Sequence, residues 1–175
     1  MAVTGNAGAE RARGLLNGIP DRFNDFCHMD QITFVQLADW LVEHADRTPN
    51  VPPEISVEES LFVFLDIAAQ GNSFRSAAYN WDHDIKLTQS IFLNMLEALQ
   101  LLHEKEDVSP SCPTFSANAN RTRWRVLRGS RPGKSRMDGL VKVGDEGGGG
   151  LEISQESLNL ALTALNNWIY EHREF

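Results

Sequence analysis

The residues best suited to binding chemistry form a basic cluster between positions 121 and 136. Phosphate neutralisation by cations supplies most non-specific DNA affinity, so this cluster predicts a nucleic-acid contact. The sequence also allows the cluster to fold back as a strap on an acidic part of the same chain. Its predicted contact residues are Arg121, Arg123, Trp124, Arg125, Arg128, Arg131, Lys134 and Arg136.

Two short runs contain side chains that bind metals in other proteins. Asp82, His83 and Asp84 are consecutive, and Cys27 adjoins His28. Neighbouring residues point in different directions and no second cluster supports either run, whereas a metal site needs several converging ligands. We therefore expect residues 82–84 to form a solvated turn and residues 27–28 to lie in the core and at its rim. We predict no metal site and no cofactor.

The sequence indicates no catalytic set. No Ser/His/Asp or Cys/His arrangement is signalled, and the glycine run 147–150 does not follow a strand as a phosphate-binding loop would. His44, His103 and His172 lie near predicted helix C-termini, where an imidazolium interacts favourably with the helix dipole. A structural role is sufficient for all three, and we predict no catalytic residue.

The stretch from Ile55 to Leu102 must position any functional surface. Ser56 and Glu59 have the spacing of a capping box, in which each side chain bonds the other's backbone N–H. The helix that follows is apolar on nearly every side, which predicts a central helix. A short helix capped by Ser73, a polar turn at 81–86 and a helix from 87 to about 103 complete a helix-turn-helix outline.

We predict an all-α fold: a helical bundle with a helix-turn-helix-like core and a C-terminal helix docked on it. Residues 1–14, rich in Gly and Ala, are expected to be disordered, and residues 15–108 to form the helical domain. Residues 109–150 are predicted to be a basic, Gly-rich linker. Residues 151–175 hold the last helix, capped by Ser154, with an apolar face of Leu158, Ala161, Leu162, Leu165, Trp168 and Ile169.

Charge separates the chain into two parts. Residues 20–109 hold 5 Lys and Arg against 16 Asp and Glu, whereas residues 110–150 hold 8 against 3. Lys86 is the only cation predicted beside the outward face of the 87–103 helix. On the same face, Leu93 and Glu97 are candidate contacts for a partner protein. Polar side chains of this helix that contact base edges in DNA would lack neighbouring phosphate contacts to position them. The candidate DNA contacts of this helix are Lys86, Gln89, Ser90 and Asn94.

Composition predicts a soluble protein of the nucleus or cytoplasm that does not enter a membrane. No apolar run approaches the roughly 20 residues of a membrane helix, and the first nine residues do not resemble a secretory signal. Cys27 and Cys112 are far apart in the sequence, which favours free thiols in a reducing compartment.

The first part of the chain resembles the N-terminal helical domain of Harbinger-type transposases and the nucleases derived from them. The resemblance runs from about Leu15 to His103, and a second segment resembles the end of the same proteins. The first match includes Leu15–Gly18, Pro20, Met29, Phe34, Leu37, Leu41, Ile55–Glu59, Phe64, Leu65, Gly71, Ser73, Arg75, Trp81, Phe92 and Leu96–Leu99. The second includes Arg123–Arg128, Leu151–Ser154, Ala161, Leu162, Ala164–Ile169 and His172.

The resemblance implies an ancestral nuclease that holds two divalent metal ions with three carboxylates. Between the two matching parts this chain has only residues 109–120, which contain no Asp or Glu, and Thr114 stands where the third acid is expected. Three functions remain open: a nuclease-inactive, transposase-derived protein that associates with DNA or chromatin, an acidic module that binds a protein partner, and, least favoured, an active nuclease. The family is also expected to work with a separate DNA-binding partner protein.

Overall fold

The fold is known from a computed structural model that describes residues 7–45, 51–106, 140–143 and 151–172. Its helices are α1 (Ala7–Leu16), α2 (Pro20–Cys27), α3 (Gln31–His44), α4 (Val57–Ala68), α5 (Phe74–Trp81), α6 (Ile85–Glu106) and α8 (Gln155–Glu171). Strands β1 (Leu140–Val143) and β2 (Leu151–Ser154) pair antiparallel, with Leu140 opposite Ser154. The predicted all-α bundle is confirmed.

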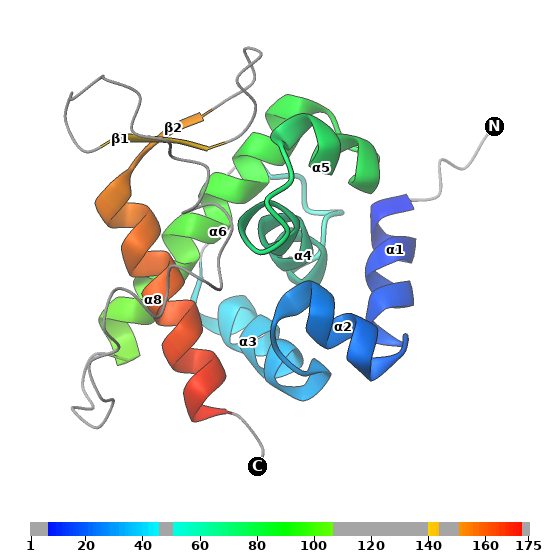
Figure 1. The fold of residues 1–175 in the computed structure, drawn as a ribbon, viewed down its shortest axis with the longest axis horizontal. Coiled ribbons are helices and arrows are strands. Elements are labelled where there is room, and N and C mark those ends of the chain that lie inside the picture. The colour runs from blue at the N-terminus through cyan, green and yellow to red at the C-terminus, as the bar shows by residue number, and fades with distance from the viewer. Residues whose placement is uncertain (1–6, 46–50, 107–139, 144–150, 173–175) are drawn as a thin grey trace.

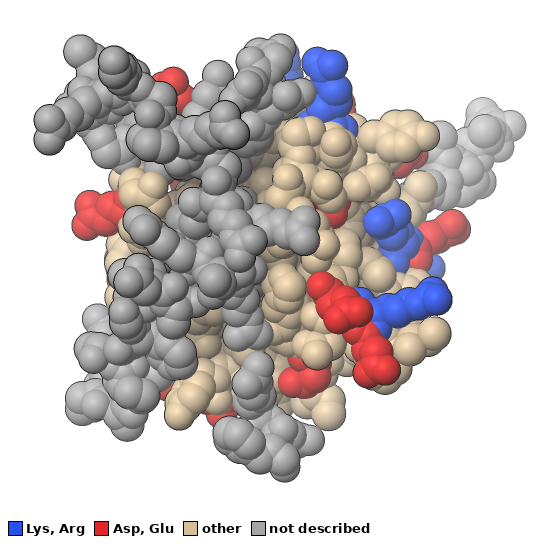
Figure 2. All heavy atoms as spheres, in the orientation of Figure 1, with Lys and Arg blue, Asp and Glu red and all other residues tan. Residues whose placement is uncertain are grey.

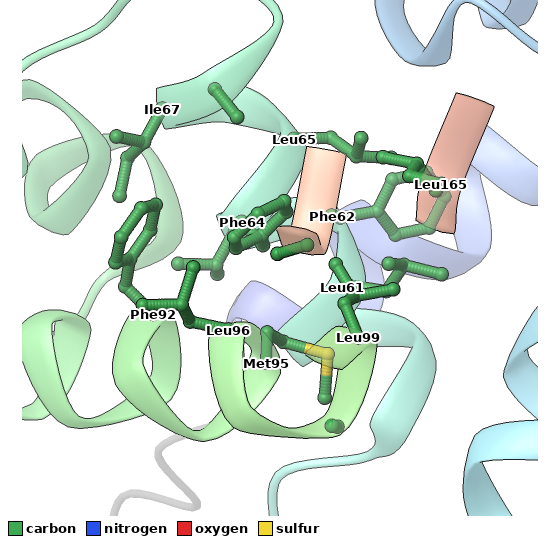
Figure 3. Close-up of a cluster of buried hydrophobic side chains, with 14 of the residues drawn as sticks. Leu61, Phe62, Phe64, Leu65, Ile67, Phe92, Met95, Leu96, Leu99 and Leu165 are labelled. Atoms are coloured by element: carbon green, nitrogen blue, oxygen red, sulfur yellow. The ribbon is translucent and has the colours of Figure 1, made fainter. Parts of the chain in front are cut away.

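Helix α4 lies at the centre of the bundle and contacts α1, α2, α3, α5 and α6 (Figure 1). Because neighbours surround it, its residues from Leu61 to Leu65 are fully buried. Phe64 stacks on Phe92 of α6 at a ring-centroid distance of 4.9 Å (Figure 3). Phe62 stacks at 4.4 Å on Phe34 of α3. The prediction of a central, all-round apolar helix is confirmed.

Side-chain caps define where the inner helices begin. The side chains of Asp30, Ser56 and Ser73 accept hydrogen bonds from the backbone N–H three residues later, at 2.8, 3.1 and 3.1 Å. The starts at Ser56 and Ser73 agree with the sequence predictions. The second half of the predicted capping box is wrong, because the Glu59 side chain is buried beside His83 instead of returning to the backbone of Ser56. Ser154 precedes α8 as predicted, but its side chain makes no capping hydrogen bond.

Helix α8 docks on the helical domain along α6 and beside α3 (Figure 1). The indole Nε1 of Trp168 donates to the backbone oxygen of Thr33 at 3.3 Å. The Thr33 hydroxyl oxygen lies 3.1 Å from the backbone oxygen of His172. The predicted apolar face is buried as expected: Leu158, Ala161, Leu162, Leu165, Trp168 and Ile169.

Two boundaries differ from the sequence predictions. Residues 7–14, expected to be disordered, belong to α1, whose Gly8 and Ala12 are buried against the bundle. Small residues of low intrinsic hydrophobicity can pack closely on another helix, so composition alone did not reveal this contact. Residues 140–143, expected to be linker, form β1, which pairs antiparallel with β2. Residues 17–19 separate α1 from α2, which begins at Pro20.

Replacing Leu61 by alanine should lower the free energy of unfolding by about 2–5 kcal/mol, because the surrounding helices cannot close the cavity fully. Urea denaturation followed by far-UV circular dichroism measures this change. Tyr79→Ala is the matched control, since Tyr79 is 88% exposed on α5 and its removal should change stability by less than about 0.5 kcal/mol. Equal effects of the two substitutions would contradict the central position of α4.

Candidate functional site: the helix-turn-helix segment

Helices α5 and α6 are joined by a turn of three residues, Asp82, His83 and Asp84. Asp82 has a left-handed backbone conformation, with φ of 55°, and ends α5. The Asp84 side chain accepts a hydrogen bond from the backbone N–H of Leu87 at 2.8 Å, which fixes the first turn of α6. The helix-turn-helix outline therefore forms.

The turn is shorter than the predicted segment 81–86. Trp81 is fully buried as the last residue of α5, and α6 begins at Ile85 instead of Leu87. The aromatic side chain is drawn into the core by contacts with Phe62, at a ring-centroid distance of 5.9 Å. A tryptophan among polar residues looked like part of the turn in the sequence, because its partner lies on another helix.

The predicted contact residues of α6 are not presented together on one open face. Lys86 and Glu97 are exposed, whereas Gln89, Ser90 and Leu93 are half-buried. Leu93 packs partly against the core.

The prediction that Asn94 points outward is wrong. Only 6% of Asn94 is exposed, and it lines a small hollow with Leu41, Val51 and Met95. A side chain in that position cannot reach a base edge. The physical reason is that α6 packs against both α4 and α8, which buries more of its circumference than a one-sided helix would bury.

The surface around the turn is acidic. Asp82 and Asp84 are exposed beside Lys86, and both repel phosphate. Over the described residues as a whole, 7 Lys and Arg stand against 18 Asp and Glu. In the described part of the visible face, basic and acidic side chains alternate without a continuous basic patch (Figure 2). The part of α6 that should approach a groove therefore lacks phosphate clamps.

The basic cluster lies outside the described residues. This applies to all eight of its predicted nucleic-acid contacts: Arg121, Arg123, Trp124, Arg125, Arg128, Arg131, Lys134 and Arg136.

A buried pair of titratable groups connects the turn to the centre of the bundle. His83 Nε2 lies 3.0 Å from Glu59 Oε1, and the two side chains are only 7% and 0% exposed. The expectation of a solvated turn holds for Asp82 and Asp84 but is wrong for His83. Charge is costly to bury unless it is paired, so Glu59 and His83 depend on each other. The sequence signal was Glu59 within a helix that is otherwise apolar.

Helix α1 covers this pair at Gly8. A Cβ atom on Gly8 would overlap Glu59 Oε1 and lie 3.0 Å from the backbone oxygen of Trp81. Arg11, one turn further along α1, lies over the Trp81 ring at 5.1 Å from its centroid. A side chain at this position would displace the Glu59 carboxyl where α1 crosses it.

A second buried carboxylate, Asp66, ties the end of α4 to α5. It accepts hydrogen bonds from Asn72 Nδ2 at 2.7 Å, Trp81 Nε1 at 3.1 Å and Asn80 Nδ2 at 3.3 Å. Asp66 is 1% exposed, so these donors replace the water that the carboxylate loses. The sequence signal was a single acid inside the apolar run from Phe62 to Ala68. Its role here is structural.

Cys27 and His28 follow the expected structural pattern. Cys27 is fully buried, and this burial raises the pKa of its thiol far above the ordinary value. A thiol that stays protonated is a poor metal ligand, because metals bind the thiolate. His28 ends α2 in a left-handed conformation, with φ of 58°. Among the described residues, no group of three or more His, Cys, Asp or Glu side chains is arranged to hold a metal ion.

Residues 5–101 match the family model named Domain of unknown function (DUF8040). The chain belongs to this family. The match covers α1 to α5 and most of α6, which are the helices that surround α4 and form the turn. No curated protein and no solved structure matches the chain. Within the described residues, no helix has both the length and the apolar character needed to cross a membrane.

Removal of one member of the buried pair should be more damaging than removal of both. His83→Ala leaves the Glu59 carboxylate buried without its partner, which should cost about 3–5 kcal/mol of unfolding free energy. The double variant Glu59→Gln, His83→Ala removes the charge and should recover part of that stability. Chemical denaturation at neutral pH of the wild type, His83→Ala, Glu59→Gln and the double variant gives the coupling energy.

Asp84→Ala is the local control, because it changes the same turn at an exposed position and should cost about 1 kcal/mol by removing the cap. If the double variant were less stable than His83→Ala, the proposed dependence of Glu59 on His83 would be wrong.

Proposed function

We propose that this chain is a non-catalytic adaptor that contacts DNA or chromatin through residues 121–136 and binds a protein partner through its acidic helical body. The observation that carries the proposal is the separation of charge. The described body has 7 basic against 18 acidic residues, whereas 121–136 contains seven cations. Residues 121–136 therefore attract phosphate. The acidic body favours a cationic or mixed protein partner.

Helix α6 is assigned no base-reading role in this proposal. Its predicted reader Asn94 is buried, and its exposed Lys86 is next to two exposed aspartates. DNA contact then depends on the basic cluster and is expected to be independent of sequence, since phosphate contacts carry no base information. The helix-turn-helix serves as a scaffold that holds α4, α5 and α6 together.

The resemblance to Harbinger-type proteins supports a transposase-derived origin without nuclease activity. The connection at residues 109–120, between the two resembling parts, contains no acidic residue, and the acids before it, Glu104, Glu106 and Asp107, are consecutive or nearly so in the sequence. The two buried carboxylates of α4 already have structural partners, Glu59 with His83 and Asp66 with Trp81. Association with DNA also favours a nuclear location over a cytoplasmic one, which imaging of the tagged chain tests.

The protein should not nick DNA. Purified chain incubated with supercoiled plasmid and either Mg²⁺ or Mn²⁺ should leave the supercoiled band unchanged, because a two-metal site requires converging carboxylates. Agarose electrophoresis measures this result. Metal-dependent nicking that disappears on substitution of an Asp or Glu of this chain would establish an active nuclease and reject the non-catalytic assignment.

Replacing Arg121, Arg123, Arg125 and Arg128 by alanine should weaken DNA binding about equally on unrelated duplexes. The plot of log affinity against log salt concentration should become less steep, its negative slope decreasing in magnitude by about 0.9 for each phosphate that the variant no longer neutralises. Fluorescence anisotropy at two or more salt concentrations measures both quantities. Lys86→Ala, which removes the exposed cation of α6, is the control and should change affinity little.

The same variants separate the alternatives. Strong binding that persists in the four-alanine variant but disappears in Lys86→Ala would assign the contact to α6. If DNA affinity is slight in all proteins and the four-alanine variant melts at a lower temperature at low salt, the cluster is an intramolecular strap. The adaptor would then have no DNA-binding half.

A further inference from the structure

Helix α3 carries an exposed apolar stripe that the bundle does not use. Ile32, Val35 and Val42 are 53%, 43% and 61% exposed. Their spacing of three and seven residues places them on one side of the helix, as in the contact face of a helix pair. Isolated exposed aliphatic residues are common, but three aligned on one helix form a surface that another helix can cover.

The stripe lies apart from the two faces of α3 that already have partners. Phe34, Leu37 and Leu41 are buried toward the core. Thr33 and Trp40 face α8. The Thr33 backbone oxygen accepts from Trp168, its hydroxyl lies 3.1 Å from the His172 backbone oxygen, and the Trp40 ring lies 6.4 Å from that of Trp168. At 100° per residue, Val35 and Val42 fall on the opposite flank from Thr33 and Trp40. Docking of α8 therefore leaves the stripe open.

Helix α3 is held rigidly enough to present the stripe. The Asp30 carboxylate accepts from both the backbone N–H and the hydroxyl of Thr33, each at 2.8 Å. Burial acts to raise the pKa of Asp30, but these hydrogen bonds outweigh it and hold the pKa below its ordinary value. Gln31 Nε2 donates to the backbone oxygens of Leu16, at 2.8 Å, and Gly18, at 3.3 Å. Together these hydrogen bonds fix where α3 begins.

Acidic side chains border the stripe. Asp39 lies between Val35 and Val42 on the same side of α3, and Glu43 follows Val42; both are exposed. The helix contains no Lys or Arg. If two copies of the chain paired antiparallel along this stripe, their Asp39 residues would meet near the twofold axis. Like charges at that point oppose self-association and favour a cationic partner.

We propose that the α3 stripe docks an amphipathic helix of a partner protein, which covers Ile32, Val35 and Val42 and places Lys or Arg beside Asp39 and Glu43. This inference rests on the protein-binding half of the proposed function and is independent of DNA binding. The partner helix would carry apolar residues at positions i, i+3 or i+4, and i+7, with basic residues on their flank.

Selection of helical peptides from a display library tests the proposal. Sixteen-residue peptides of random sequence on a helix-forming frame, about 24 Å long when helical, are selected on the intact chain. Recovered peptides should combine the apolar spacing with enrichment in Lys and Arg. Fluorescence anisotropy then compares peptide binding to variants of the intact chain.

Val35→Lys with Val42→Lys should weaken peptide binding by about tenfold or more, because it removes apolar contacts and repels the basic flank. Asp39→Asn should weaken binding roughly two- to fivefold at low salt and less at high salt, as for an exposed ion pair. Tyr79→Lys adds one lysine at an exposed site on α5, away from the stripe, and should leave affinity unchanged. Thermal melting confirms that each variant is folded.

Several results would overturn the proposal. These are the recovery of no peptide, selection of acidic peptides, or equal affinity for the wild type and the double lysine variant. Self-association of the wild type that the double variant lacks, seen by sedimentation, would make a second copy the occupant. A large increase in peptide affinity in the four-alanine variant of residues 121–128 would make the chain's own basic cluster the occupant. If Leu93→Ser and Glu97→Gln abolish binding instead, the α3 site is wrong while the protein-binding function stands.

Discussion

Complete enclosure of α4 is the constraint on which the rest of the structure depends. A helix that is apolar around its whole circumference must be surrounded, so five neighbouring helices are required to bury it. The aromatic rings of Phe34, Phe62, Phe64 and Phe92 fill the space between these neighbours. α6 then becomes the second inner helix, because it is covered by α4 on one side and α8 on another.

Enclosure also explains the buried polar groups. The two carboxylates on α4 cannot reach solvent, so each acquires a partner from the helix-turn-helix segment: Glu59 pairs with His83, and Asp66 binds Trp81, Asn72 and Asn80. These contacts join α4 to α5 and the turn at both ends of the short helix. Gly8 allows α1 to cover the first pair. The turn that was a candidate to approach DNA is consequently tied inward.

The position of α6 limits what the helix-turn-helix can do. In DNA-binding proteins with this motif, the second helix enters the major groove and needs an open face with cations near its start. Here α8 and α4 bury much of that helix, and exposed aspartates adjoin Lys86. The same packing leaves the outer flank of α3 open. Surface chemistry thus shifts the candidate binding role of the helical body from nucleic acid to protein.

The sequence by itself determined the all-α class, the caps at Ser56 and Ser73, the central position of α4 and the buried face of α8. Each of these follows from local hydrogen bonding or from the periodicity of apolar residues. Both signals lie within one short stretch of the sequence. Only the tertiary structure decided that Trp81 and Asn94 are buried, that Glu59 pairs with His83, that residues 140–143 form a strand and that α1 begins at Ala7. All of these depend on partners from other elements, and α8 and β2 in particular lie far along the chain from the helices they affect. Periodicity shows which side of a helix is apolar, whereas the number of neighbours that cover it is set by how distant segments pack.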